Sequence, residues 1–150
     1  MRLLVQRVTR ASVSIGGAVH SSIDRGLLVF VGIGYDDTTE DASWLASKAA
    51  GLRIFDDEDG VMNLDVRQID GSVLVISQFT LMAMTRKGNR PSYVRAAGEP
   101  VAMPLYEYFL GAMSREAGGR VAAGVFGADM QVSLVNDGPV TIWIDSKNRE

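Results

Sequence analysis

Alternating and continuous apolar runs divide the chain into predicted strands. Residues 3–15 nearly alternate apolar and polar side chains and lead into Gly16-Gly17, which is typical of a strand that enters a hairpin. The continuous apolar run 27–31 predicts a strand that is covered on both faces. Further strands are expected at 53–55, 71–81, 121–126, 130–135 and 140–144, with a turn at 136–139 between the last two.

Two segments show helical spacing instead. Threonines and acids at 36–41 supply capping oxygens, and the apolar positions that follow predict a helix over 39–51. A second helix is predicted over 101–117, with Pro104 in its first turn. Strands that bracket two helices indicate an α/β chain with a mixed sheet. We expect one domain over residues 1–145 and a flexible tail at 146–150.

Composition then removes several kinds of chemistry. The 150 residues contain no cysteine and one histidine, His20, so thiol catalysis, disulfides and a two-histidine metal centre are excluded within one chain. The acidic turn at 56–60 lacks the remainder of a calcium-binding loop and is interpreted as solvated. Gly32-Ile33-Gly34 lacks the third glycine of a dinucleotide fingerprint and is interpreted as a turn former. We expect no metal and no cofactor.

No apolar run approaches the roughly 20 residues of a membrane-spanning helix. We therefore expect a soluble, cytoplasmic protein that does not bind membranes. The net charge of −3 conceals a local excess of positive charge, because the stretch 71–98 contains no acid and four basic residues: Arg86, Lys87, Arg90 and Arg95. Such a stretch is either a solvated loop or a patch that contacts phosphates.

Two polar segments carry the remaining candidate chemistry. Ser77-Gln78-Phe79-Thr80 ends a predicted strand on which Gln78 and Thr80 share one face. Polar residues on a buried strand either face a cavity or have hydrogen-bond partners. Asn136-Asp137-Gly138-Pro139-Val140-Thr141 is by itself a turn in which Pro139 cannot donate a hydrogen bond.

Together, these segments resemble the two signature motifs of the D-aminoacyl-tRNA deacylases, also called D-tyrosyl-tRNA deacylases. The similarity extends over nearly the whole chain and includes Gln6-Arg7-Val8, Leu52-Arg53-Ile54-Phe55 and Thr85-Arg86-Lys87-Gly88. It departs from the family at Met82 and Met84, where many members carry tyrosine and aspartate. The resemblance implies an α/β domain with a mixed, barrel-like sheet, a homodimer, and hydrolysis of the ester that joins a D-amino acid or glycine to tRNA.

The resemblance also implies roles for individual residues. The implied catalytic residues are Ser77, Gln78, Phe79 and Thr80; the residues that select chirality from the other subunit are Gly138 and Pro139, joined by a cis bond and supported by Asn136 and Thr141. Phe126 and Gly127 would hold the terminal adenosine, and Arg86, Lys87 and Arg90 the tRNA phosphates.

The catalytic step has two alternatives. Either Thr80 is a nucleophile, or the ribose 2′-hydroxyl helps to activate water while the backbone N–H groups of Phe79 and Thr80 stabilise the oxyanion; we favour the second. No histidine is near Thr80 in the sequence, and His20 stays a candidate to activate it from elsewhere in the fold. Two other classes stay open, a non-catalytic tRNA-binding module and a small-molecule esterase or amidase.

Overall fold

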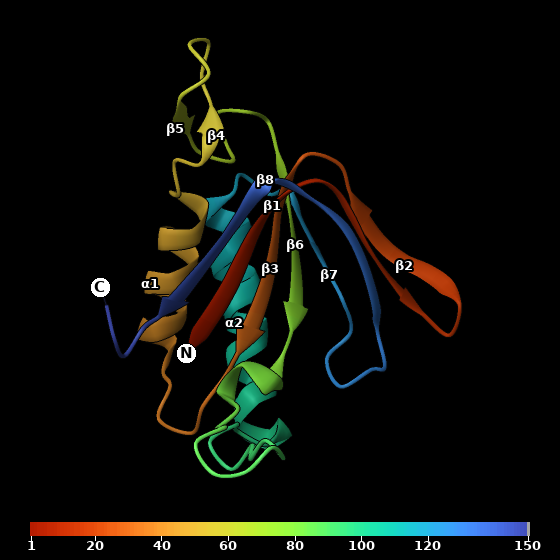
Figure 1. The fold of residues 1–150 in the computed structure, drawn as a ribbon, viewed down its shortest axis with the longest axis vertical. Coiled ribbons are helices and arrows are strands. Elements are labelled where there is room, and N and C mark those ends of the chain that lie inside the picture. The colour runs from red at the N-terminus through yellow and green to blue at the C-terminus, as the bar shows by residue number, and fades with distance from the viewer. Residues whose placement is uncertain (150) are drawn as a thin grey trace.

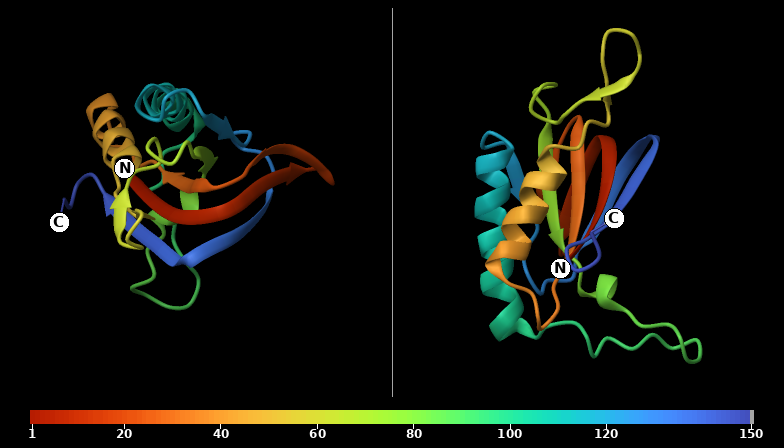
Figure 2. Two further views of the ribbon diagram at one scale, coloured as in Figure 1. Left: turned by 90° about the horizontal axis from the view of Figure 1, so that it is seen from above. Right: turned by 90° about the vertical axis from the view of Figure 1, so that its left-hand side faces the viewer.

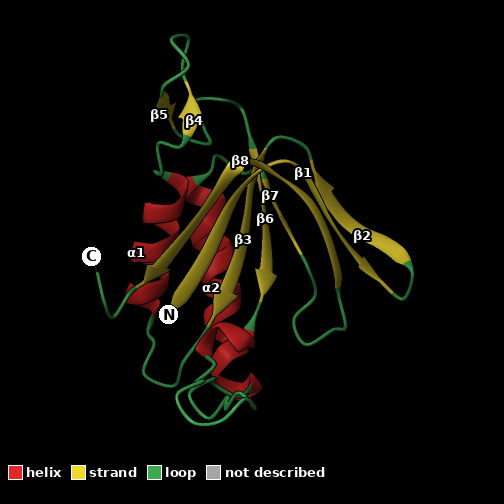
Figure 3. Cartoon of the chain, viewed as in Figure 1, coloured by secondary structure: helices red, strands yellow, loops and turns green. Residues whose placement is uncertain are grey.

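A long, bent first strand organises the protein. The computed structural model describes residues 1–149. Its strands and helices, shown in Figures 1 and 3, are β1 (Arg2–Ile15), β2 (Ala18–Ile23), β3 (Gly26–Gly32), α1 (Thr39–Ala50), β4 (Phe55–Asp56), β5 (Met62–Leu64), β6 (Ser72–Ser77), the 3₁₀ helix η1 (Phe79–Met82), α2 (Glu99–Glu116), β7 (Val121–Ala123) and β8 (Gln131–Asp145).

The sheet is mixed, as the sequence predicted. One edge of β1 pairs antiparallel with β3 and then with β2, while its other edge pairs antiparallel with β8. On the far side of β3, β6 and β7 follow as parallel neighbours. Ser21 Oγ of β2 donates to the carbonyl of Ala123 in β7 at 2.8 Å, so the two ends of the sheet meet and the barrel is nearly closed.

Both helices cover one face of this sheet (Figure 2). The main core lies between the helices and the sheet and contains Phe55, Leu45 and Phe109, none of which is exposed. A second cluster, which includes Leu28 and Leu74, lies on the face of the sheet opposite to the helices. Because apolar side chains pack against both faces of β3, its sequence shows the continuous apolar run rather than an alternation. Within residues 1–149, no helix is long and apolar enough to cross a membrane.

The strand predicted at 71–81 is shorter than expected. β6 ends at Ser77, and the chain turns into η1, in which Leu81 N–H donates to Gln78 O and Ala83 N–H to Thr80 O. The reason is that β3 ends at Gly32, so the bond from Gln78 N–H to Val31 O is the last that β6 makes to it. The prediction that Gln78 and Thr80 share a strand face is therefore wrong.

The prediction of a turn at 136–139 is also wrong, because the chain does not reverse its direction there. β8 is one continuous strand that pairs with β1 on both sides of this segment, and the pairing shifts register twice as it passes Val8. We call residues 136–141 the Gly138–Pro139 bulge. The peptide bond between Gly138 and Pro139 is cis, and Pro139 has no N–H to give to the ladder.

Residues 146–149, which fall in the segment 146–150 expected from the sequence to be a flexible tail, contact the rest of the protein. Ser146 is buried, and its N–H donates to the Met1 carbonyl at 2.9 Å. Lys147 Nζ lies 2.8 Å from an Asp41 carboxylate oxygen, and the Arg149 guanidinium lies over the Trp44 ring. Residues 146–149 thus pack along α1, through charges whose partners are distant in sequence.

Candidate active site

The Ser77-to-Thr80 motif lies at the end of β6, where the strand gives way to η1. Gln78 is held through its backbone by Val31 and donates from its side chain to Thr80 Oγ1 at 2.6 Å. Phe79 is 57% exposed, which is unusual for an aromatic residue beside a buried strand. The N–H groups of Phe79 and Thr80 open the 3₁₀ turn, so they have no acceptor within it.

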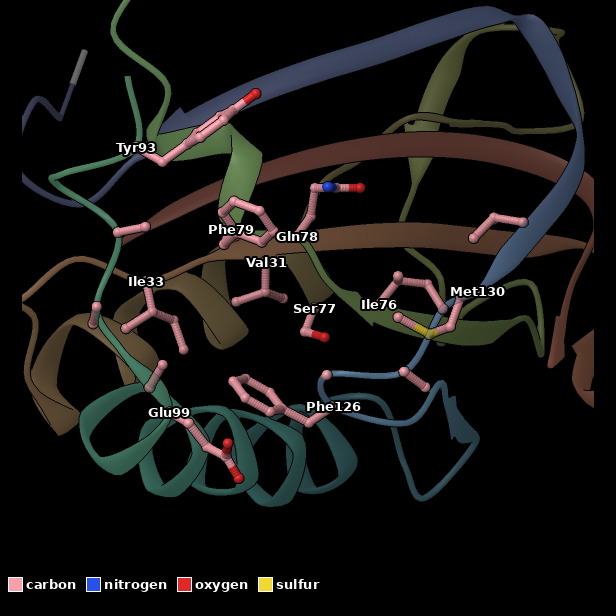
Figure 4. Close-up of a pocket in the computed structure, with 16 residues that line it drawn as sticks. Val31, Ile33, Ile76, Ser77, Gln78, Phe79, Tyr93, Glu99, Phe126 and Met130 are labelled. Atoms are coloured by element: carbon pink, nitrogen blue, oxygen red, sulfur yellow. The ribbon is translucent and has the colours of Figure 1, made fainter. Parts of the chain in front are cut away.

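These residues border a cavity of about 600 Å³ (Figure 4). Ser77 and Phe126 lie on facing sides of it, and Phe79 lies beside Tyr93, with the ring centroids 5.2 Å apart and the rings nearly perpendicular. The lining comes from the ends of β3 and β6, from η1, the segment before α2, the start of α2, the segment between β7 and β8, and the start of β8. It comprises Val31, Ile33, Ile76, Ser77, Gln78, Phe79, Tyr93, Ala96, Ala97, Glu99, Ala102, Phe126, Gly127, Ala128, Met130 and Val132.

Phe126 forms one wall of the cavity from a loop, not from the strand predicted at 121–126, because β7 ends at Ala123. Its ring packs on Tyr106 of α2 with centroids 5.6 Å apart. Tyr106 in turn donates its hydroxyl to the Val75 carbonyl, and burial raises the pKa of Tyr106 to about 12. The phenol therefore stays neutral at physiological pH, and it fixes the Phe126 wall to β6.

The cavity offers little side-chain chemistry of the acid–base kind. Among the residues that the structure describes, Glu99 at the start of α2 is the one charged residue of its lining. His20 lies exposed on β2 and does not line the cavity, so it is not placed to activate Thr80. Glu99 and Tyr93 were not predicted as site residues, because nothing in the pattern of 83–100 indicates which of its residues turn toward β6.

Polar side chains of β8 and of its neighbour β1 hold the Gly138–Pro139 bulge; Gln6 of β1 is the cross-strand partner of Thr141. Asn136 accepts from Val140 N–H at 2.9 Å and donates to Thr141 Oγ1 at 2.9 Å. Gln6 donates to the same hydroxyl at 3.2 Å. The Asn136 side chain thus gives Val140 N–H an acceptor where the ladder is interrupted, and the Thr141 hydroxyl holds the Asn136 side chain in place.

Arg7 holds the bulge from within the protein. It is 7% exposed, donates to Asp137 O at 3.0 Å and to Ile54 O at 2.6 Å, and lies 3.4 Å from an Asp56 carboxylate oxygen. A buried guanidinium is stable only when paired and hydrogen-bonded in this way. The sequence does not distinguish Arg7 from the other polar positions of the nearly alternating segment 3–15, because its partners Ile54, Asp56 and Asp137 are distant in the chain.

The predicted site residues form three groups in the structure. Ser77, Gln78, Phe79, Phe126 and Gly127 line one cavity, and Thr80 is bonded to Gln78 beside it. The Gly138–Pro139 bulge does not line that cavity; Gly138 and Pro139 are exposed on another part of the same chain.

The third group, Arg86, Lys87 and Arg90, lies on an exposed loop that projects from the body of the protein (Figure 2). Reciprocal bonds between Met84 and Ser92 close its base, and the chain that follows supplies Tyr93, Ala96 and Ala97 to the cavity lining. Among the described residues, none of the three cations forms an ion pair. The basic loop therefore adjoins the cavity with its charges unpaired.

The Ser77-to-Thr80 motif thus lies at an open cavity where a strand ends. The cavity belongs to a small α/β domain with a nearly closed sheet. The family described as D-Tyr-tRNA(Tyr) deacylase matches residues 4–145, and the chain belongs to this family of hydrolases. The D-aminoacyl-tRNA deacylases of Akkermansia muciniphila and of Porphyromonas gingivalis strain W83 are each 59% identical to it over 150 residues, which is the full length of both chains in each comparison.

Two solved structures are similar. The c-Myc DNA Unwinding Element Binding Protein superposes with a TM-score of 0.92 and 39% identity, over 97% of this chain and 98% of the other. A structure described as that of a probable eukaryotic D-amino acid tRNA deacylase has a TM-score of 0.81 over 95% of this chain and 97% of the other. Its 16% identity shows the shared fold alone.

Proposed function

We propose that the protein hydrolyses the ester between a D-amino acid, or glycine, and the terminal adenosine of tRNA, and so acts in the cytoplasm where charged tRNA is used. The observation that carries the proposal is the cavity, which gathers the Ser77-to-Thr80 motif of the family with Phe126 beside an unpaired basic loop. This arrangement suits an aminoacylated RNA end, which combines a base, an ester and phosphates.

The test is turnover of D-tyrosyl-, L-tyrosyl- and glycyl-tRNA with protein well below the substrate concentration. We expect many turnovers for the D- and glycyl-substrates and none for the L-substrate. Binding without turnover would support a tRNA-binding module instead. Equal turnover of a free D-tyrosine ester would support a small-molecule esterase.

For the chemical step, we propose that backbone N–H groups stabilise the oxyanion and that the ribose 2′-hydroxyl of the RNA helps to activate water. The N–H groups of Phe79 and Thr80 would donate to the developing oxyanion, an interaction worth several kcal/mol when the donors are preorganised. Gln78 and Ser77 would orient the ester. Since Thr80 Oγ1 already accepts a bond from Gln78 and no histidine lines the cavity, the ribose 2′-hydroxyl is the better candidate to activate water.

For chirality, we propose that the Gly138–Pro139 bulge of one subunit enters the cavity of a second subunit in a homodimer. Gly138 and Pro139 are exposed, the bulge is fixed by Arg7 and Asn136, and it does not line the cavity of its own chain. Carbonyls of the bulge that point at the substrate α-carbon would admit a hydrogen and collide with an L side chain. Selection would then come from rejection, without a pocket for the D side chain.

Phe126→Ala is expected to raise KM for D-tyrosyl-tRNA by about tenfold with little change in kcat, because stacking on an aromatic ring contributes about 1–3 kcal/mol per base. Steady-state kinetics measure both constants. Phe126→Tyr, which keeps the ring, should bind normally. An unchanged KM in a folded Phe126→Ala protein would remove the adenosine from this wall.

Replacing Arg86, Lys87 and Arg90 together by alanine is expected to weaken binding of all tRNAs alike. The slope of log Kd against log salt concentration should become shallower by about one for each phosphate that the loop no longer neutralises. Titrations at several salt concentrations measure this slope. Arg10→Ala, which removes an exposed arginine of β1, is the matched control and should leave the slope unchanged. An unchanged slope in the triple variant would place the phosphates elsewhere.

A further inference from the structure

Leu81, which directly follows the Ser77-to-Thr80 motif, is contacted by two other segments of the chain. Arg2 Nη1 donates to the Leu81 carbonyl at 3.0 Å. On another side, η1 approaches Gly32 so closely that a Cβ added there would lie 2.8 Å from Leu81 Cβ and 3.1 Å from Gln78 O. Real Cβ atoms essentially never show the first distance, so η1 occupies space that only a glycine leaves open.

Arg2 is itself held rigidly. Its Nε donates to the Asp145 carboxylate at 2.9 Å, and its guanidinium lies 5.5 Å from the centre of the Trp143 ring. Both contacts come from the end of β8, which pairs with β1 at this point. The planar guanidinium thus donates one hydrogen bond to β8 and another to η1. A lysine ammonium cannot reproduce this pair of bonds with the same geometry.

Such external contacts matter because η1 is too short to fix its own position. It has four residues, and the two bonds that close it, from Leu81 N–H to Gln78 O and from Ala83 N–H to Thr80 O, leave its placement on the sheet undetermined. The bond from Gln78 N–H to Val31 O holds the start of η1, and the close approach at Gly32 and the side chain of Arg2 place the rest of it.

We propose that Arg2 and Gly32 are positioning residues for the deacylation step, because together they determine where Phe79 and Thr80 lie in the cavity. The inference rests on the proposed role of the Phe79 and Thr80 N–H groups. Oxyanion donors act over a narrow range of distance, so a shift of η1 reduces stabilisation of the transition state more than it reduces binding of the substrate.

The experiment compares Arg2→Ala, Arg2→Lys and Gly32→Ala with Arg10→Ala, an exposed arginine of the same strand. For D-tyrosyl-tRNA we expect Arg2→Ala and Gly32→Ala each to lower kcat by about ten- to a hundredfold, with KM changed less than about twofold, since misplacement of about 1 Å costs about a hundredfold in rate. Arg2→Lys should fall between Arg2→Ala and the wild type, and Arg10→Ala should match the wild type.

The double variant gives a second readout. Because both residues act on one segment, the combined decrease in kcat of Arg2→Ala with Gly32→Ala should be smaller than the product of the separate decreases. Circular dichroism and thermal unfolding confirm that each variant is folded at the assay temperature. Arg2→Lys keeps the charge and most of the packing, so its kcat tests the proposal if Arg2→Ala does not fold.

The possible failures are distinguishable. A wild-type protein that does not turn over D-tyrosyl-tRNA would overturn the proposed function. An active wild type with unchanged kcat in the folded Arg2 and Gly32 variants would overturn this inference alone. A rise in KM without a fall in kcat, or decreases in kcat that multiply, would overturn it as well, because the two residues would then not act together on the catalytic segment.

Discussion

Gly138→Ala is expected to let the enzyme hydrolyse L-tyrosyl-tRNA and to reduce its preference for the D-substrate by at least about tenfold, or about 1.4 kcal/mol. Gly138 has φ = +126°, where L residues rarely lie. An added Cβ would also come within 2.9 Å of Arg7 Nη2 and 3.0 Å of Val140 Cγ2. The strained φ and the crowding are relieved either by a shift of the bulge itself or by a shift of Arg7, which holds the bulge through Asp137 O. In both cases the bulge carbonyls lose their fixed position, and rejection by collision is expected to fail.

The measurement is the ratio of kcat/KM for D- and L-tyrosyl-tRNA. Gly60→Ala is the matched control, because Gly60 also has a positive φ, +74°, but has open space where a Cβ would lie, at the tip of the β4–β5 hairpin. It should retain the wild-type ratio. If Gly138→Ala were folded and still rejected the L-substrate fully, the bulge would not be the chiral filter.

The fold was largely predictable because its strongest patterns are local. The run 27–31 indicated a strand with two covered faces, and β3 has both faces buried. Threonine and acids before the first helix indicated its start, and Thr38 with Asp41 forms the capping box there. In both cases the residues that determine the element lie within it or next to it, so the sequence alone contains the necessary information.

The wrong predictions concern features that depend on partners distant in sequence. The residues around Pro139 suggested a turn, but pairing with β1 on both sides keeps β8 continuous, and Arg7 supports the bulge from more than a hundred residues away. Similarly, the β-branched run before Ser77 continues the strand pattern, yet β6 stops where β3 stops. Local propensity does not register the length of a neighbouring strand.

The site was predictable as motifs but not as a cavity. Ser77 and Phe126 were named from separate segments, and the structure places them on facing sides of one space. Glu99 and Tyr93 complete the lining, the first from the opening turn of α2 and the second from a segment without regular secondary structure. Which residues of such a segment face inward is set by tertiary contacts, here the bonds that close the basic loop between Met84 and Ser92.

Removing the ribose 2′-hydroxyl of the substrate should have the largest effect on the chemical step. We expect a D-tyrosyl-tRNA that ends in 2′-deoxyadenosine to be hydrolysed about 10²- to 10⁴-fold more slowly, the usual contribution of a positioned general acid or base. Single-turnover rates at saturating enzyme isolate chemistry from binding, and KM should change little. The expectation follows from a cavity in which Glu99 is the one charged lining residue within 1–149.

Two protein variants separate this mechanism from its competitors. Thr80→Ala should keep a rate near that of the wild type, because its hydroxyl accepts a bond from Gln78 and lacks a base to activate it. Glu99→Gln should also keep a rate near that of the wild type, since in this mechanism the 2′-hydroxyl, and not the carboxylate, helps to activate water. Near-complete loss of rate in Thr80→Ala would make Thr80 the nucleophile. Loss of rate in Glu99→Gln with a normal rate on the 2′-deoxy substrate would make the carboxylate the base, and the RNA would then contribute binding alone.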